Sequence, residues 1–73
     1  MMNSIRINDE FIKLGQALKL ANLVSSGVDA KFVITDGLVK VNGEVDVRRG
    51  RKLYPGDTFT YNRKTVTVEG KAE

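Results

Sequence analysis

The sequence contains no cysteine and no histidine among its 73 residues. Without cysteine the chain has neither a disulfide framework nor a thiolate nucleophile. Without histidine it lacks the commonest general base and the commonest metal ligand of proteins. Its longest uninterrupted apolar run is only Phe32-Val33-Ile34, which is too short for a membrane span or for the core of a signal peptide. We therefore expect a cytoplasmic protein that holds no metal or cofactor and has no membrane partner.

Motifs of enzyme active sites are missing as well. The chain has no GxxxxGK or GxGxxG loop for phosphates or dinucleotides, and no cluster of ligands fit for zinc or calcium. Its acidic residues are scattered, and we expect those that flank a turn, such as Glu44 and Asp46, to be solvated surface acids. The sequence therefore predicts no catalytic residues, no metal site, no enzymatic activity and no small-molecule substrate.

The length of the chain is close to the lower limit for a domain that folds alone. A domain this small buries only roughly 60% of the surface that its unfolded chain exposes, which leaves little room for a deep pocket. Apolar residues make up 41% of the sequence and charged residues 29%, as in an ordinary soluble domain. We expect a single domain over residues 1–73, with its core at about 4–68 and a flexible tail at 69–73.

The positive charge is concentrated in one short segment. The formal net charge is +3, yet residues 1–47 sum to −1 and residues 53–73 sum to zero. The whole excess therefore lies in residues 48–52, which are Arg48, Arg49, Gly50, Arg51 and Lys52. Such a run is either a solvated loop or a phosphate-binding patch.

The first half of the chain has two helical patterns. Apolar residues at Phe11, Leu14, Leu18 and Ala21 follow one helical face, which predicts a helix over about 10–21. Asn8 and Asp9 are its expected N-caps. Gly15 would weaken this helix by roughly 1 kcal/mol relative to alanine, unless another backbone must approach closely there.

A second helix is predicted to begin at Ser25-Ser26-Gly27 and to end at Gly37. Ser26 with Asp29 forms a variant of the capping box, and the buried side is expected to consist of Ala30, Val33 and Ile34. The first amides of a helix have no internal partner and bind anions well. Gly27 would let a phosphate approach the backbone, and Lys31 could supply a cation one turn later. The alternative is an ordinary serine cap followed by a glycine.

From Leu38 onward the pattern is typical of β-strands. Asn42-Gly43 is a turn signal between two short strands. A two-residue loop would mix apolar and polar faces, so we favour a bulged three-residue loop that pairs Lys40 with Glu44 and Val39 with Val45.

The remaining segments complete a small sheet. We expect a second hairpin of strands at 58–61 and 64–68, with Phe59 opposite Val66, after a type II turn at Tyr54-Pro55-Gly56-Asp57. Residues 4–7 alternate between polar and apolar side chains, as in a short edge strand. Two short helices followed by an antiparallel sheet make an α+β domain.

Motifs spread over nearly the whole chain, from about residue 4 to residue 68, occur together in one known family. They are Ser25-Ser26-Gly27, Ala30-Lys31, Gly37-Leu38-Val39-Lys40-Val41-Asn42-Gly43, Arg48-Arg49-Gly50-Arg51-Lys52-Leu53 and Pro55-Gly56-Asp57. In this combination the sequence closely resembles the S-four RNA-binding domain, which is named after the fourth small-subunit ribosomal protein. It is most similar to the small stand-alone bacterial branch, the YaaA/YbcJ-like proteins. The resemblance implies an αL-type RNA-binding motif, with two short helices packed on a small antiparallel sheet.

The resemblance also implies where RNA would bind. The family's surface is the helix pair with its adjoining loops, which on this chain corresponds to Lys13, Lys19, Ser25, Ser26, Gly27, Lys31, Arg48, Arg49, Arg51 and Lys52. Many members have an arginine at the position of Gly27 and contact a phosphate with it. Gly27 has no side chain, so the resemblance does not carry this arginine–phosphate contact over to this sequence. The expected partner is structured RNA, with ribosomal RNA or ribosomal particles as the natural candidates.

Two further considerations bear on the function. Phe11, Phe32 and Phe59 fit the core, so we do not expect a stacking platform for single-stranded bases. The alternatives to RNA binding are a small protein-interaction adaptor, for example one that is ribosome-associated without direct RNA contact, and a DNA-binding protein.

Overall fold

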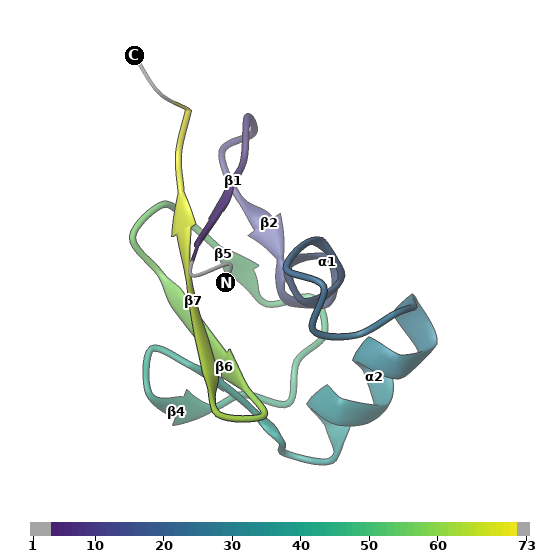
Figure 1. Ribbon diagram of the computed structural model, residues 1–73. Coiled ribbons are helices and arrows are strands. Elements are labelled where there is room, and N and C mark those ends of the chain that lie inside the picture. Colours follow the sequence, from purple (N-terminus) through teal and green to yellow (C-terminus); the bar gives the residue numbers. More distant parts are fainter. Residues whose placement is uncertain (1–3, 72–73) are drawn as a thin grey trace.

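The helical and alternating patterns of the sequence produce nine short elements. The computed structural model describes residues 4–71. In chain order the elements are β1 (Ser4–Arg6), β2 (Ile12–Lys13), α1 (Leu14–Leu20), α2 (Gly27–Thr35), β3 (Val39–Val41), β4 (Glu44–Val45), β5 (Lys52–Leu53), β6 (Thr58–Tyr61) and β7 (Lys64–Glu69). The predicted α+β class is confirmed, with two helices beside a sheet (Figure 1). The last part of the predicted tail, residues 72–73, lies outside the described residues.

The main sheet is mixed rather than purely antiparallel. Its five strands have the order β1-β7-β6-β3-β4, and β1 pairs with β7 in parallel while the other neighbours are antiparallel. The predicted edge strand at the start of the chain is thus present, and it forms one edge of the sheet beside β7. The second hairpin has the predicted register, with Phe59 opposite Val66.

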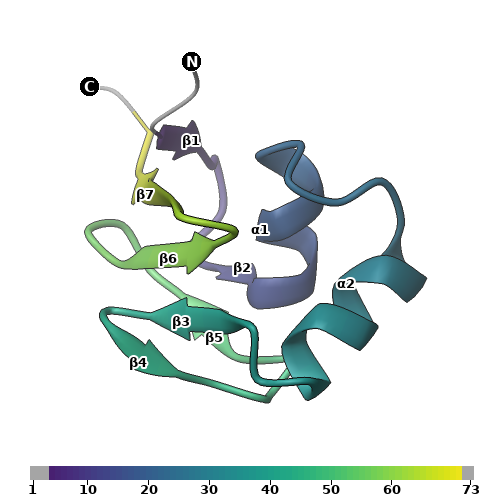
Figure 2. The same ribbon diagram turned by 60° about the horizontal axis from the view of Figure 1, so that its bottom comes forward.

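The two helices cover one face of this sheet and enclose the core (Figure 2). The largest fully buried side chains come from both helices and from four strands, namely Leu14, Leu18, Ile34, Val39, Leu53, Phe59, Val66 and Val68. Each such side chain contributes roughly 1.5–3 kcal/mol through burial. No helix within residues 4–71 has both the length and the apolar character needed to cross a membrane.

The prediction for the first helix was wrong at its beginning. Residues 12–13 form β2, which pairs with β5, and α1 begins only at Leu14. The helix has no side-chain cap, so Asn8 and Asp9 do not cap it. Instead the backbone amides of Leu14 and Gly15 donate to the carbonyl oxygens of Arg51 and Arg49, at 2.8 and 3.1 Å. A segment distant in sequence therefore sets the helix start.

The predicted bulged register of the first hairpin was also wrong. Val41 lies opposite Glu44 and Lys40 opposite Val45, around a two-residue turn in which Asn42 and Gly43 both have positive φ angles of 52° and 88°. Asparagine and glycine tolerate these angles, and they give the turn that matches strand twist. Because β4 is an edge strand, Val45 can remain exposed without disturbing the core.

Most other local predictions are confirmed. The Ser26 hydroxyl caps α2, Gly37 follows this helix with a φ of 76°, and the turn at Tyr54-Pro55-Gly56-Asp57 is closed by a 2.9 Å hydrogen bond. One core prediction fails, because Phe32 is 60% exposed. Phe11 is partly buried, and only Phe59 of the three phenylalanines is fully buried.

Candidate nucleic-acid interface

The basic segment, residues 48–52, is folded around a buried carboxylate. The Asp46 carboxylate accepts hydrogen bonds from the Arg48 backbone amide at 2.9 Å, from the Arg48 guanidinium at 3.0 and 2.8 Å, and from Arg51 Nη1 at 2.7 Å. Asp46 is only 8% exposed, so the prediction that it is a solvated surface acid was wrong. Asp46 therefore fixes the positions of two of the four cations in the basic segment.

The electrostatics of Asp46 follow from these bonds. Its hydrogen bond to the Arg48 side chain is the main cause that holds the pKa of this carboxyl well below its usual range, while burial opposes the shift. The carboxylate in turn raises the pKa of Arg48 above its ordinary value. Such charge-assisted bonds hold both guanidinium groups in a fixed orientation.

Hairpin register explains why Asp46 is buried. The Asp46 amide donates to the Val39 carbonyl at 3.1 Å, which continues the two-residue-loop register past β4 and turns Asp46 inward beside Val39. The neighbouring Val45 and Val47 are each 55% exposed. An acid that alternates with two valines just before an arginine pair was the signal that sequence reasoning missed.

Arg49 is held differently from its neighbours. A Cβ atom added to Gly15 would lie 2.9 Å from Arg49 Cγ and 3.7 Å from the Arg49 carbonyl oxygen. The close contact is therefore with the Arg49 side chain, because the Arg49 carbonyl oxygen lies at an ordinary contact distance, and Gly15 leaves room for that side chain rather than for another backbone. The missing side chain at Gly15 allows Arg49 to lie across the start of α1, toward α2.

This arrangement creates an open groove of about 660 Å³ between the two helices and the basic segment. Four cations line it, from four separate parts of the chain: Lys13, Lys19, Lys31 and Arg49. Its remaining lining residues are Gly15, Gln16, Ser26, Gly27, Val28, Ala30 and Gly50. Among residues 4–71, no carboxylate and no aromatic ring contributes to this lining. We call this feature the basic groove.

The start of α2 forms one wall of the basic groove. The Ser26 hydroxyl accepts from the Asp29 amide at 3.1 Å, and a Cβ on Gly27 would meet nothing within 4 Å. The first backbone amides of the helix are therefore open to an approaching anion. Asp29 opposes such an anion, but its carboxylate accepts from Ser25 at 3.2 Å and lines a different depression.

The ten residues predicted for RNA binding thus lie in three different places. The structure brings together six of them in the basic groove: Lys13, Lys19, Ser26, Gly27, Lys31 and Arg49. Ser25 faces the Asp29 side instead. Arg48, Arg51 and Lys52 line a shallower depression of about 580 Å³ with Gly50 and Tyr54, and we call this the tyrosine depression. The prediction that the whole basic run forms one continuous groove with α2 was therefore only partly right.

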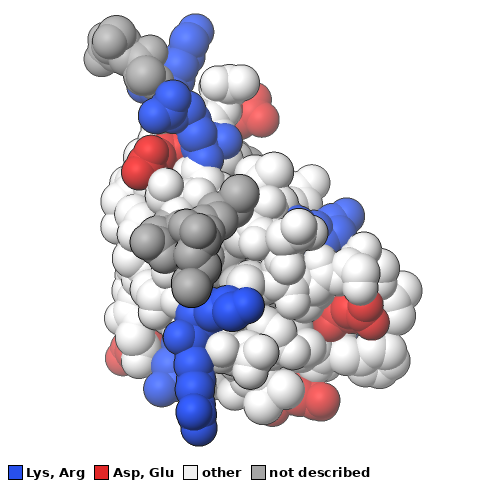
Figure 3. Space-filling model, viewed as in Figure 1, with Lys and Arg blue, Asp and Glu red and all other residues white. Residues whose placement is uncertain are grey.

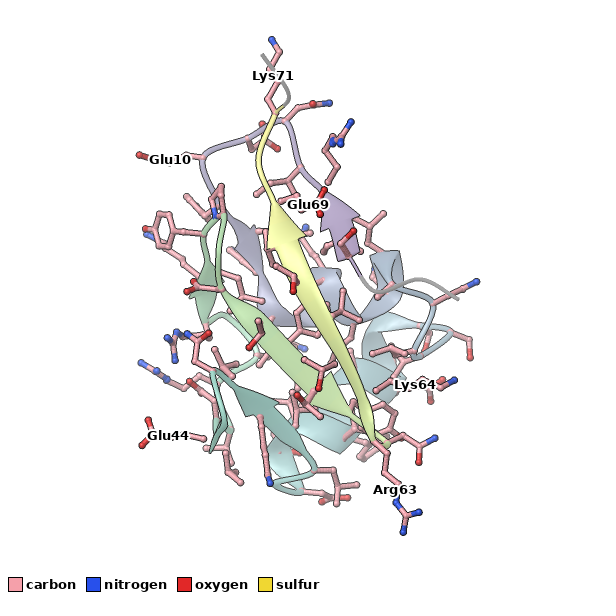
Figure 4. The ribbon with its side chains drawn as sticks, turned by 60° about the vertical axis from the view of Figure 1, so that its left-hand side comes forward. Glu10, Glu44, Arg63, Lys64, Glu69 and Lys71 are labelled. Atoms are coloured by element: carbon pink, nitrogen blue, oxygen red, sulfur yellow. The ribbon has the colours of Figure 1, made fainter. Side chains whose placement is uncertain are left out.

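The face of the molecule that carries β7 has side chains of both charges. The face centred on β7 carries basic and acidic side chains in separate small patches, with acidic surface over α2 (Figure 3). Arg63 and Lys64 extend outward from the β6–β7 turn, at the opposite end of β7 from Glu69 and Lys71 (Figure 4). The part of the chain that the structure describes contains no group of three residues suited to holding a metal ion.

A two-helix α+β domain with a groove lined by cations from several elements is typical of small nucleic-acid-binding modules. A family model described as the S4 domain matches residues 5–69, and the chain belongs to this S4 domain family.

Three comparisons with known proteins agree with this assignment. The chain is 54% identical over 70 residues to a probable ribosome maturation protein, RlbA of Bacillus subtilis (strain 168), covering 96% of this chain and 89% of that protein. It is 37% identical over 57 residues to YbcJ of Escherichia coli (strain K12), covering 78% of this chain and 81% of YbcJ. The solution structure of YbcJ, described as revealing an αL motif involved in RNA-binding, superposes with a TM-score of 0.73 at 31% identity, covering 94% of this chain and 89% of YbcJ. The αL-type fold that the resemblance implied is confirmed.

Proposed function

We propose that this protein binds structured RNA through the basic groove and catalyses no reaction of its own. The observation that carries the proposal is the lining of that groove, where Lys13, Lys19, Lys31 and Arg49 converge without a carboxylate. Because the four cations come from separate elements, they lie close together only in the folded protein. This arrangement fits a ligand with several regularly spaced negative charges, such as a nucleic-acid backbone.

The chemistry of the groove favours recognition of the backbone over recognition of bases. Arg49 can donate two parallel hydrogen bonds to one phosphate, and the lysines act as point charges. The open amides at the start of α2 add neutral donors for a further phosphate oxygen. No aromatic ring among residues 4–71 lines this groove, so bases cannot stack in it. A-form RNA, which proteins read largely by shape, phosphates and 2′-hydroxyls, suits such a surface.

We infer that the RNA is ribosomal RNA, bound either free or within a maturing ribosomal particle. Support comes from the names of the relatives, since RlbA is a probable ribosome maturation protein and shares 54% identity with this chain. The function would then be carried out in the cytoplasm. No cofactor is required, because binding depends only on side chains and backbone amides of the chain itself.

A protein-interaction adaptor remains the second candidate. Val28 and Phe32 lie four residues apart on α2 and are 63% and 60% exposed, which is unusual for large apolar side chains. An adaptor that binds through this surface would show affinity insensitive to salt. RNA binding through the basic groove would show the opposite.

The decisive experiment is a titration of a structured ribosomal RNA fragment at several salt concentrations. Four phosphate contacts release about four counterions, so log K should fall with log salt at a slope of roughly −3 to −4. Lys31→Ala should flatten this slope by roughly one unit, since it removes one contact. It should also leave the melting temperature unchanged or slightly higher, since a cation near the start of a helix opposes the helix dipole.

Lys64→Glu provides the matched control. It reverses a charge at an exposed position at the start of β7, outside the basic groove. We expect it to change affinity far less than Arg49→Glu, which should weaken binding by more than tenfold. A flat salt titration, or equal affinity of parent, Lys31→Ala and Arg49→Glu proteins with normal melting, would overturn the proposed function.

A further inference from the structure

The tyrosine depression lies on the other side of Gly50 from the basic groove. Gly50 lines both features, and a Cβ atom added there would meet nothing within 4 Å. Gly50 itself therefore puts no side chain between the basic groove and the tyrosine depression. The proposed function does not use the residues of this second feature.

An exposed aromatic ring is the distinctive element of the tyrosine depression. Tyr54 is 43% exposed, and one side of its ring packs on Phe11 with centroids 5.9 Å apart at an interplanar angle of 52°. The Tyr54 amide donates to Asp57 Oδ2 at 2.8 Å, and the Asp57 amide donates back to the Tyr54 carbonyl at 2.9 Å. The Tyr54 ring is thus held by packing and by a closed turn. Stacking of a ligand on this ring therefore costs the protein little conformational entropy.

Cations line the same depression as this ring. Lys52 Nζ lies 4.9 Å from the centroid of the Phe11 ring, next to Tyr54. Arg48 and Arg51 line the same depression, and the Arg48 side chain is 68% exposed although it is paired with Asp46. Asp46 itself is buried, so it orients the Arg48 guanidinium while most of the Arg48 side chain stays accessible to an anion.

We propose that the tyrosine depression binds one unpaired nucleotide of the same RNA, with its base stacked on Tyr54 and its phosphate held by Lys52 and Arg48. This inference rests on the proposed function, since the basic groove would hold the adjoining duplex. An exposed ring beside several cations matches the two parts of a nucleotide, a flat base and an anionic phosphate. The RNA recognised is therefore a helix interrupted by a bulge or a flipped base, rather than a continuous duplex.

The test compares three RNA hairpins of the same sequence: one continuous, one with a single bulged nucleotide, and one with an abasic site at the bulge. The parent protein should bind the bulged hairpin about tenfold more tightly than the continuous one, within the range that stacking of one base on an aromatic ring produces. The abasic bulge should lose most of this preference. Because this comparison uses the unaltered protein, it does not depend on whether any variant folds.

Variants then locate the effect at the ring. Tyr54→Ala should abolish the preference for the bulged hairpin, and Tyr54→Phe should retain it, because phenylalanine keeps the stacking surface. Phe32→Ala is the matched control, since it removes an exposed ring on α2 that lies outside both features. In a Tyr61→Phe background, Tyr54 is the remaining tyrosine of a chain without tryptophan, so stacking should quench the tyrosine fluorescence.

The outcomes separate the two proposals. Equal affinity for the three hairpins, with Arg49→Glu still weakening all of them, would refute the nucleotide subsite and leave the proposed function standing. Weak, salt-insensitive binding of every hairpin would instead overturn the proposed function itself. A bulge preference that survives Tyr54→Ala would place the unpaired base elsewhere and would also refute the subsite.

Discussion

Replacing Asp46 with asparagine tests whether this carboxylate organises the basic segment. The change keeps the size and shape of the side chain but removes its charge and one acceptor oxygen. The amide group would face a guanidinium donor of Arg48 or Arg51, which it cannot satisfy. We therefore expect both a loss of stability and a loosening of the two arginines.

The loss of stability expected for Asp46→Asn follows from the hydrogen bonds that are shielded from water. The Arg48 side chain is 68% exposed, so solvent screens its guanidinium bonds and we leave them out of this sum. The bond from Arg51, whose side chain is 31% exposed, and the bond from the Arg48 backbone amide remain. Weakening these two bonds costs about 2 kcal/mol in total. For a domain of this size that loss lowers the melting temperature by roughly 8–16 °C.

The dependence on pH gives a second, independent check. Pairing with Arg48 lowers the pKa of Asp46 in the folded protein, so the ionised carboxylate stabilises the fold above the unfolded pKa of about 3.9. This stabilisation is lost as the pH falls from about 5 toward the acid end of the range. The difference in melting temperature between parent and Asp46→Asn should therefore be constant from pH 7 to 5 and should shrink in more acidic solution.

Thermal melts followed by circular dichroism between pH 2 and pH 7 measure both effects. Asp36→Asn is the matched control, because Asp36 is an exposed acid at the end of α2, and its melts should stay within about 0.5 kcal/mol of the parent. An Asp46→Asn variant that melts like the parent at pH 7, or a difference between the two that persists unchanged at pH 2, would refute this role of Asp46.

Three other predictions concern the basic segment, the helix that it contacts and the choice between RNA and DNA. Arg51→Glu should melt well below the parent, since it brings a second carboxylate beside Asp46, whereas Arg49→Glu should melt nearly as the parent does. Equal melting temperatures of these two variants would contradict the pairing. Gly15→Ala should weaken RNA binding several-fold because its Cβ would displace Arg49, whose Cγ lies 2.9 Å from that position. The stability of Gly15→Ala should stay within about 1 kcal/mol of the parent, because the gain in helix propensity offsets the displacement; unchanged affinity in a titration would show that Arg49 is not needed where it lies. Addition of a tenfold excess of duplex DNA should compete poorly with the structured RNA, and equal competition would favour a DNA-binding protein.

Sequence alone determined the features that depend on neighbouring residues. The Ser26 cap, the positive φ angle at Gly37, the type II turn at residues 54–57 and the pairing of Phe59 with Val66 were all predicted. Each follows from backbone preferences or from alternation within a few residues. The family motifs, which extend over nearly the whole chain, supplied the α+β fold in addition. The concentration of charge at residues 48–52 was likewise visible without coordinates.

Tertiary structure alone decided which of those charges lie together. The first helix begins at Leu14 because its amides bind carbonyl oxygens of residues 49 and 51, a contact that no local pattern encodes. The same contact places Arg49 in the basic groove with Lys31. The hairpin register, set by the φ angles of the Asn42-Gly43 turn, buries Asp46 and thereby engages Arg48 and Arg51. Hydrophobic periodicity does not predict this register, because an exposed edge strand accepts either pairing; the backbone angles of the turn fix it, and the buried carboxylate then meets its two arginines.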